Sequence, residues 1–224
     1  MSDAMELLAR HHGDTETFVT AMKQNAPNRF DDGFWQIWQQ WIQPTLSDDA
    51  TVCDFGCGPA QFFEQLHVRL PQAKLIGVEC MPYMITEINT GICEVIQHDL
   101  NQANLNLAND SVDTFLTSFV LHEMVQPIYA LKDMYRCLKS GQRGLILDWV
   151  RAPLEIYLQH MYETDIIDTT LPEQKLINMF NHFSEHNRYT LEDMSWLLEK
   201  VGFKILQQQR ADNLNFAHWV VEKP

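Results

Sequence analysis

Positive charge, cysteine and long apolar runs are all scarce in this sequence. Its 224 residues carry 16 Lys and Arg against 30 Asp and Glu, which gives a formal net charge of −14. Such a surface repels a polyanion unless a local basic patch overrides it, and the basic residues are scattered along the chain. The composition therefore disfavours a nucleic-acid partner. Because no apolar run approaches the roughly 18–20 residues of a membrane-spanning helix, we also expect no membrane partner.

The five cysteines are an odd number and lack the spacing of a disulfide framework. The first residues include charged and histidine side chains in place of the apolar segment of a secretory signal. Both features predict reduced thiols in a cytoplasmic protein. Cys53 and Cys57 are close in sequence, but no second pair of ligands lies nearby, so we expect no metal site.

From residue 51 onwards, short apolar segments alternate with helical patterns. Strands are predicted at 51–55, 75–79, 93–97, 112–119, 144–150, 203–209 and 216–222, and helices at 62–70, 82–90 and 126–138. Strands and helices that alternate at this spacing form right-handed βαβ units around a parallel sheet, so the fold class is α/β. A last helix is predicted to begin at Thr190, which forms a capping box with Asp193, and to end at Gly202.

Two helical segments lie outside this alternation. Residues 1–46 place apolar and aromatic side chains at helical spacing, which predicts an N-terminal helical cap that packs on the main domain or forms a lid over a ligand pocket. Residues 151–187 are a predicted helical insertion after the fifth strand of the main domain, 47–224. The insertion offers candidates for an acceptor pocket, with simple cap packing as the alternative: Arg151, Tyr157, His160 and Tyr162.

The most informative segment is 52–60, Val-Cys-Asp-Phe-Gly-Cys-Gly-Pro-Ala, where a predicted strand runs through a glycine-rich turn into a helix. Gly56 and Gly58 let the backbone approach a ligand without an intervening Cβ. Ligands of open α/β sheets bind at this place, beyond the carboxyl end of the first strand. The dinucleotide fingerprint needs a small residue where Gln61 stands, whereas the small residue here is Ala60, one position earlier.

The charge of this segment also bears on the ligand. A phosphate site favours Lys or Arg, and neither occurs between residues 50 and 67, whereas the carboxylate of Asp54 suits a cationic ligand. The pattern D-x-G-x-G-x-A resembles motif I of the class I S-adenosylmethionine-dependent methyltransferases, with Ala60 in place of the last glycine. The resemblance implies that Asp54 positions the amino group of the cofactor's methionine, and that Gly56 and Gly58 pass beside its methionyl and ribose parts. A generic tight turn is the alternative.

Further members of the predicted cofactor site follow at the ends of the second, third and fourth strands. The resemblance implies that Glu79 accepts hydrogen bonds from the ribose hydroxyls and that Met81 packs on the adenine. Asp99 is expected to accept from the adenine amine, with the backbone of Leu100 beside it, and Ser118 is expected to contact the cofactor. The alternatives are a solvent-exposed Glu79 and an Asp99 that only forms a turn.

His122 follows the fourth predicted strand, where the family that this chain resembles places catalytic residues. Its ordinary pKa, near neutrality, suits a general base, and the alternative is a histidine that only orients the loop or the cofactor. Glu123 is interpreted as a favourable charge at the start of a helix. The Asn/Asp-Pro-Pro-aromatic motif of amino-directed DNA and protein methyltransferases is absent from the sequence.

The resemblance covers roughly residues 50–222 and implies a Rossmann-like sheet of seven strands in the order 3-2-1-4-5-7-6, with the last strand antiparallel. It also implies an enzyme that moves a methyl group from S-adenosylmethionine to a small-molecule acceptor by in-line displacement. A protein or tRNA methyltransferase, a non-catalytic S-adenosylmethionine-binding subunit and a nicotinamide-dependent oxidoreductase are the alternatives. A homodimer remains open.

Overall fold

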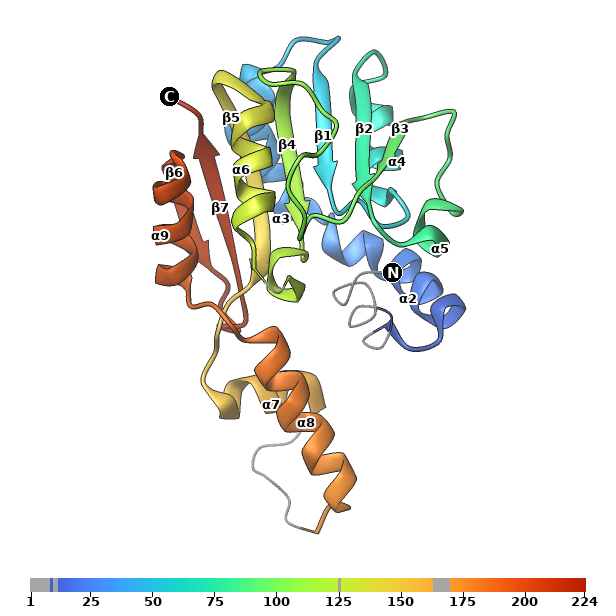
Figure 1. The fold of residues 1–224 in the computed structure, drawn as a ribbon, viewed down its shortest axis with the longest axis vertical. Helices are drawn as coiled ribbons and strands as arrows, with labels where there is room; N and C mark the ends of the chain where they lie inside the picture. Colours follow the sequence, from blue (N-terminus) through green and yellow to red (C-terminus); the bar gives the residue numbers. More distant parts are fainter. Residues whose placement is uncertain (1–8, 10–11, 125, 163–169) are drawn as a thin grey trace.

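A seven-stranded sheet forms the centre of the molecule (Figure 1). The structure is a computed structural model, and it describes residues 9, 12–124, 126–162 and 170–224. The strands are β1 (Thr51–Phe55), β2 (Lys74–Glu79), β3 (Glu94–Gln97), β4 (Val112–Ser118), β5 (Leu138–Trp149), β6 (Lys204–Arg210) and β7 (Phe216–Glu222). Their order is β3-β2-β1-β4-β5-β7-β6, with β7 antiparallel to both neighbours and the other pairs parallel. This confirms the strand order and the antiparallel last strand that the resemblance implied.

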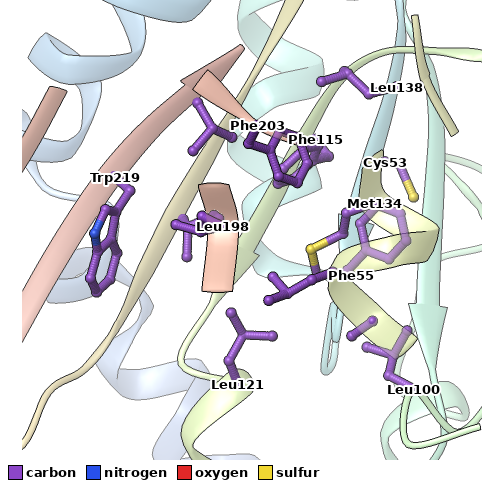
Figure 2. Close-up of a cluster of buried hydrophobic side chains, with 14 of the residues drawn as sticks. Cys53, Phe55, Leu100, Phe115, Leu121, Met134, Leu138, Leu198, Phe203 and Trp219 are labelled. Carbon is purple, nitrogen blue, oxygen red and sulfur yellow. The ribbon is translucent and has the colours of Figure 1, made fainter. Parts of the chain in front are cut away.

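Helices cover both faces of the sheet (Figure 1). One face carries α6 (Ile128–Cys137) and α9 (Leu191–Val201), and the other carries α3 (Asp32–Ile37), η1 (Trp38–Ile42), η2 (Gln43–Thr45) and α4 (Gln61–Arg69). Successive strand residues point to opposite faces, so neighbours in β4 join different cores. Phe115 packs in the cluster beneath α6 and α9, where its ring lies 5.8 Å from that of Phe203 (Figure 2), and Leu116 packs in the cluster beneath α3 and α4.

Local sequence signals explain how α9 begins and ends. The hydroxyl of Thr190 accepts a hydrogen bond from the backbone of Asp193, whose carboxylate accepts one from the backbone of Thr190. The predicted capping box is therefore confirmed. The helix ends at Gly202, whose φ of +120° lies in a region that side-chain-bearing residues rarely adopt.

The N-terminal segment has two parts with different positions. α3 and η1 bury Phe34, Trp35 and Trp38 in the cluster that also contains Phe62 of α4, as the packing interpretation predicts. α2 (Thr15–Arg29) instead lies beside the edge of the sheet at which the parallel strands end (Figure 1). Residues 1–8, 10 and 11 of the predicted cap lie outside the described residues.

The predicted insertion after β5 contains two helices, α7 (Leu154–Tyr162) and α8 (Glu173–His186), which extend beyond the same edge of the sheet (Figure 1). They share a small core around Tyr157, Leu158 and Met179. Residues 163–169 of the predicted insertion lie outside the described residues. α2 and the insertion thus both stand at the edge where a ligand of this kind of sheet binds.

Two elements differ from their predicted lengths. The helix predicted at 82–90 is only α5 (Pro82–Ile85), and Asn89 then forms a turn in which its side chain accepts a hydrogen bond from the backbone of Gly91. β5 begins at Leu138 instead of 144, because backbone hydrogen bonds between residues 141–142 and Lys223 continue its pairing beyond the end of β7. Among the described helices, none is long and apolar enough to cross a bilayer.

Candidate active site

A cavity of about 410 Å³ lies at the edge of the sheet where the parallel strands end. Its walls come from the ends of β2 and β4, the loops after β1 and β3, α2 and the insertion. Most of the residues predicted for the cofactor and the chemistry line it: Gly56, Gly58, Glu79, Met81, Asp99, Leu100, Ser118 and His122. The predicted residues Asp54 and Ala60 are not among the lining residues.

The turn after β1 requires both of its glycines. Gly56 and Gly58 have φ angles of +80° and +53°, in the left-handed region. A Cβ on Gly56 would overlap the side chain of Val120, and one on Gly58 would lie 3.0 Å from the Cε of Met22. The backbone at Gly56 also donates to the carbonyl of Val78 at 2.8 Å, which ties the turn to β2. The two glycines therefore allow the backbone of this turn to line the cavity.

Ala60 acts at the start of α4 and does not reach the cavity. It has a φ of +62° and is the N-cap of that helix, with an exposed fraction of 3%. A small side chain tolerates this left-handed conformation better than a bulky or β-branched one. Its contact with a cofactor stays a prediction.

Asp54 is a buried carboxylate without a hydrogen bond at one oxygen. Its residue is 4% exposed, and Oδ1 has no hydrogen-bond partner among the described residues. Burial raises the pKa of Asp54 to about 8, helped by Glu79 and opposed by the nearby Arg29 cation. A buried polar atom of this kind is costly unless a partner arrives. Asp54 precedes the Gly56 turn without itself lining the cavity, and the chemistry of its orphaned oxygen suits a cationic group.

Glu79 lines the cavity but also organises its floor. Its carboxylate accepts backbone hydrogen bonds from Gly58 at 3.0 Å, Cys80 at 2.8 Å and Met81 at 2.9 Å. Burial raises the pKa of Glu79 even though these three donors favour the ionised form. Two of the bonds end on Oε1 and one on Oε2, so the remaining acceptor capacity for a ribose hydroxyl lies mainly on Oε2.

Asp99 forms a turn, as the alternative interpretation proposed, and lines the cavity as well. Its Oδ1 accepts from the backbone and side chain of Asn101 at 3.0 and 3.1 Å, and its Oδ2 accepts from the side chain of Gln102 at 3.3 Å. Leu100 and Met81 provide apolar surface in the same cavity. The contact of Asp99 with adenine stays a prediction, because both of its oxygens already accept hydrogen bonds.

The end of β4 carries a polar group and a strained residue side by side. The hydroxyl of Ser118 lines the cavity and finds no hydrogen-bond partner in the part of the chain that the structure describes. Phe119 follows with a φ of +59°, held there by a 2.8 Å hydrogen bond from its backbone to the carbonyl of Leu147. Left-handed backbone at a large residue costs of order 1–3 kcal/mol and clusters at functional sites.

His122 is buried against a carboxylate that sequence reasoning missed. Its Nδ1 lies 2.6 Å from Oδ1 of Asp148 on β5, and its Nε2 lies 3.8 Å from Oε1 of Glu123. Burial alone would lower the pKa of His122, but the charges of Asp148 and Glu123 outweigh it and the pKa is raised. Asp148 is itself 0% exposed and also accepts from the backbone of Leu121 at 2.6 Å. An acid in the otherwise apolar segment 145–149 is the sequence signal that could have identified Asp148.

Aromatic side chains form the wall near His122. Trp149 and Phe216, whose rings lie 4.4 Å apart, line the cavity together with Phe119. From the insertion, Met161 and His182 line it, and His182 is hydrogen-bonded to the hydroxyl of Tyr157. The predicted acceptor-pocket residues do not: Arg151, Tyr157, His160 and Tyr162 are absent from the lining. The expectation was wrong for Tyr157 because this side chain packs in the core of the insertion.

Comparison with known proteins identifies the family. A family model described as "Methyltransferase domain" matches residues 28–208, so the chain belongs to this methyltransferase family. A solved S-adenosylmethionine-dependent methyltransferase shares its fold, which makes S-adenosylmethionine the candidate cofactor. The orphaned Asp54 oxygen and the glycine turn that a Cβ would obstruct fit such a cofactor.

Individual proteins resemble this chain either over a short segment or at low sequence identity. A trans-aconitate 2-methyltransferase of Escherichia coli O139:H28 is 33% identical over 57 residues, which are 25% of this chain and only 23% of the relative. Phosphoethanolamine N-methyltransferase 2 of Haemonchus contortus has a TM-score of 0.70 at 13% identity, over 100% of this chain and 61% of that one. An S-adenosylmethionine-dependent methyltransferase of Aquifex aeolicus has a TM-score of 0.63 at 15% identity, over 100% of both chains. These similarities support the fold and leave the acceptor undetermined.

Proposed function

We propose that this methyltransferase acts on a small-molecule acceptor that binds in the cavity at the carboxyl ends of the strands. The observation that carries the proposal is the cavity, whose volume of about 410 Å³ is in the range of small-molecule sites. Its walls include α2 and the insertion, which stand over the strand ends and leave no extended basic groove among the lining residues. The net charge of −14 further opposes a nucleic-acid acceptor.

The predicted cofactor residues divide among the parts of S-adenosylmethionine. The buried carboxylate of Asp54 favours a cationic partner, and it binds the amino group of the methionine directly or through water. Glu79 binds the ribose through Oε2, while Met81, Asp99 and Leu100 form the adenine end. When bound, S-adenosylmethionine supplies an electrophilic methyl group together with its own leaving group.

The protein contributes alignment, exclusion of water and a base. Alignment and desolvation account for up to roughly 7–11 kcal/mol in favourable cases. His122 removes a proton where the acceptor must lose one, since the 2.6 Å contact of its Nδ1 with Asp148 orients the ring in the cavity wall. The raised pKa of His122 makes it a stronger base once it has lost its own proton.

The acceptor lies against the aromatic wall of Phe119, Trp149 and Phe216, near His122. A planar or unsaturated molecule suits such a wall. The name of the E. coli relative gives trans-aconitate as its acceptor, so small unsaturated carboxylates are the first compounds to test.

The test is transfer of a labelled methyl group from S-adenosylmethionine into a panel of small carboxylates and into a cell extract separated by size. We expect label in the small-molecule fraction, and a His122→Gln variant should transfer much less. Label confined to protein or tRNA would replace the proposal with a macromolecular acceptor. Tight binding of S-adenosylhomocysteine without transfer to any fraction would indicate a non-catalytic subunit. Light scattering of the same preparation decides whether the protein is a homodimer.

A further inference from the structure

Arg29 places one cation in a cavity that is otherwise lined by acids, neutral polar and apolar groups and histidines. It is in the last turn of α2, and among the described lining residues it is the sole Lys or Arg. Acidic side chains in the same lining are Glu79, Asp99 and Glu123. One cation does not make this acidic cavity attractive to anions in general. It suits a single specific contact with one anionic group.

The guanidinium of Arg29 stacks on an aromatic ring. Its Cζ lies 4.9 Å from the ring centroid of Phe119. No carboxylate of the described residues lies within ion-pair distance of it, although Asp54, Glu123 and Asp148 act on it electrostatically from further away. Stacking on a ring uses the face of the guanidinium and leaves its planar edge of N–H donors available. That edge matches the two oxygens of a carboxylate.

Arg29 interacts electrostatically with acidic groups near the proposed cofactor site and near His122. Its strongest electrostatic partner is Asp54, the proposed site of the methionine amino group, and its weaker partners Glu123 and Asp148 surround His122. Burial lowers the pKa of Arg29, so a bound anion would recover part of the hydration that the cation has lost. An Asp beside an Arg is complementary to an amino-acid zwitterion, whose ammonium and carboxylate need opposite partners.

We propose that Arg29 is a carboxylate-binding residue of the cavity, which takes the carboxylate of the cofactor's methionine part or that of the acceptor. This inference rests on the proposed function only in taking the cavity as the binding site for both molecules. It assigns the N-terminal helix α2 a direct role in ligand recognition. It also explains why Phe119 is held in a strained conformation, since that conformation presents the ring on which Arg29 stacks.

The experiment compares S-adenosylhomocysteine with its decarboxylated analogue by calorimetry, in the wild-type protein and in Arg29→Gln. If Arg29 binds the methionine carboxylate, the wild type should prefer the carboxylated ligand by roughly ten- to a hundredfold, and the variant should lose this preference. Arg69→Gln is the matched control, because Arg69 is also stacked on a ring, that of Trp35 at 3.8 Å, but lies outside the cavity. Arg29→Lys, which keeps the charge, should retain part of the preference.

A second arm tests the acceptor as the source of the carboxylate. With S-adenosylhomocysteine bound, succinate should raise the thermal midpoint of the wild type more than succinamide does, and Arg29→Gln should remove this difference. A positive result in either arm supports the proposal and says which carboxylate is bound. If Arg29→Gln alters neither comparison, the proposal is overturned. Methyl transfer to macromolecules alone would instead refute the proposed acceptor class, while the first arm still decides the role of Arg29.

Discussion

Cofactor binding should displace a proton from Asp54. Burial raises the pKa of this carboxyl to about 8, so most of the unliganded protein carries it protonated at pH 7. The ammonium of the cofactor's methionine part favours the carboxylate form, because a charge-assisted hydrogen bond then replaces an orphaned oxygen. Binding at pH 7 should therefore release most of one proton, and the release should decline towards zero well above pH 8.

Calorimetry measures this release directly. S-adenosylhomocysteine is titrated at pH 7 in phosphate and in Tris, and the dependence of the apparent enthalpy on the ionisation enthalpy of the buffer gives the protons released. Asp54→Asn should bind more weakly and release almost none. Equal release by the wild type and the variant would refute the assignment, because the proton would then come from another group.

The same pKa predicts how stability depends on pH. The pKa of Asp54 is higher in the folded protein than in the unfolded chain, so its stabilising contribution is complete below about pH 4 and is lost as the pH rises through about 8. At about 1.4 kcal/mol per unit, the shift corresponds to at most about 6 kcal/mol. Unliganded Asp54→Asn should therefore have a higher thermal midpoint than the wild type at pH 8, and the two midpoints should converge at low pH.

Three further changes test the site. Gly58→Val should weaken S-adenosylhomocysteine binding at least tenfold, about 1.4 kcal/mol, because its φ is +53° and its side chain would meet Met22; unchanged affinity in calorimetry would contradict the site. Glu79→Ala should weaken binding and also lower the unfolding free energy by roughly 1–3 kcal/mol, because three backbone donors lose their acceptor, as a urea titration will measure. The rate of methyl transfer should rise with pH through the raised pKa of His122, above 6.5, and this limb should be missing from His122→Gln; an identical pH profile would exclude His122 as the base.

Those parts of the fold that depend on local pattern were predictable from the sequence. Short apolar segments and a glycine turn placed β1, β4 and β7 within a residue or two, and the Thr190 capping box placed the start of α9. β5 was predicted too short because its first residues are polar, and their pairing partner at Lys223 is distant in the chain. Sequence pattern does not contain that information.

The candidate site divides in the same way. Residues at the carboxyl end of a strand, such as Glu79 and Ser118, were predicted because the carboxyl ends of parallel strands meet at one edge of the sheet. Asp148 was missed, although an acid inside an apolar strand is a usable signal. The insertion residues were chosen wrongly because the pattern of α7 does not determine which face turns towards the cavity. Met161 turns towards it, and Tyr157 turns into the insertion core.

The sequence left two interpretations of the N-terminal segment, packing on the main domain or a lid over a ligand pocket. One part of the segment fits the first interpretation, and the other part lines the cavity. Phe34 and its aromatic neighbours pack against the sheet and fix the position of the helices that precede β1. α2, anchored by this packing, brings Met22 to the Gly58 turn and Arg29 to the vicinity of Asp54. Burial in this region is what raises the pKa of Asp54, and the charge of Arg29 limits the rise. If the cavity binds a zwitterionic ligand as proposed, changes in α2 should alter its affinity as well as changes in the motif after β1.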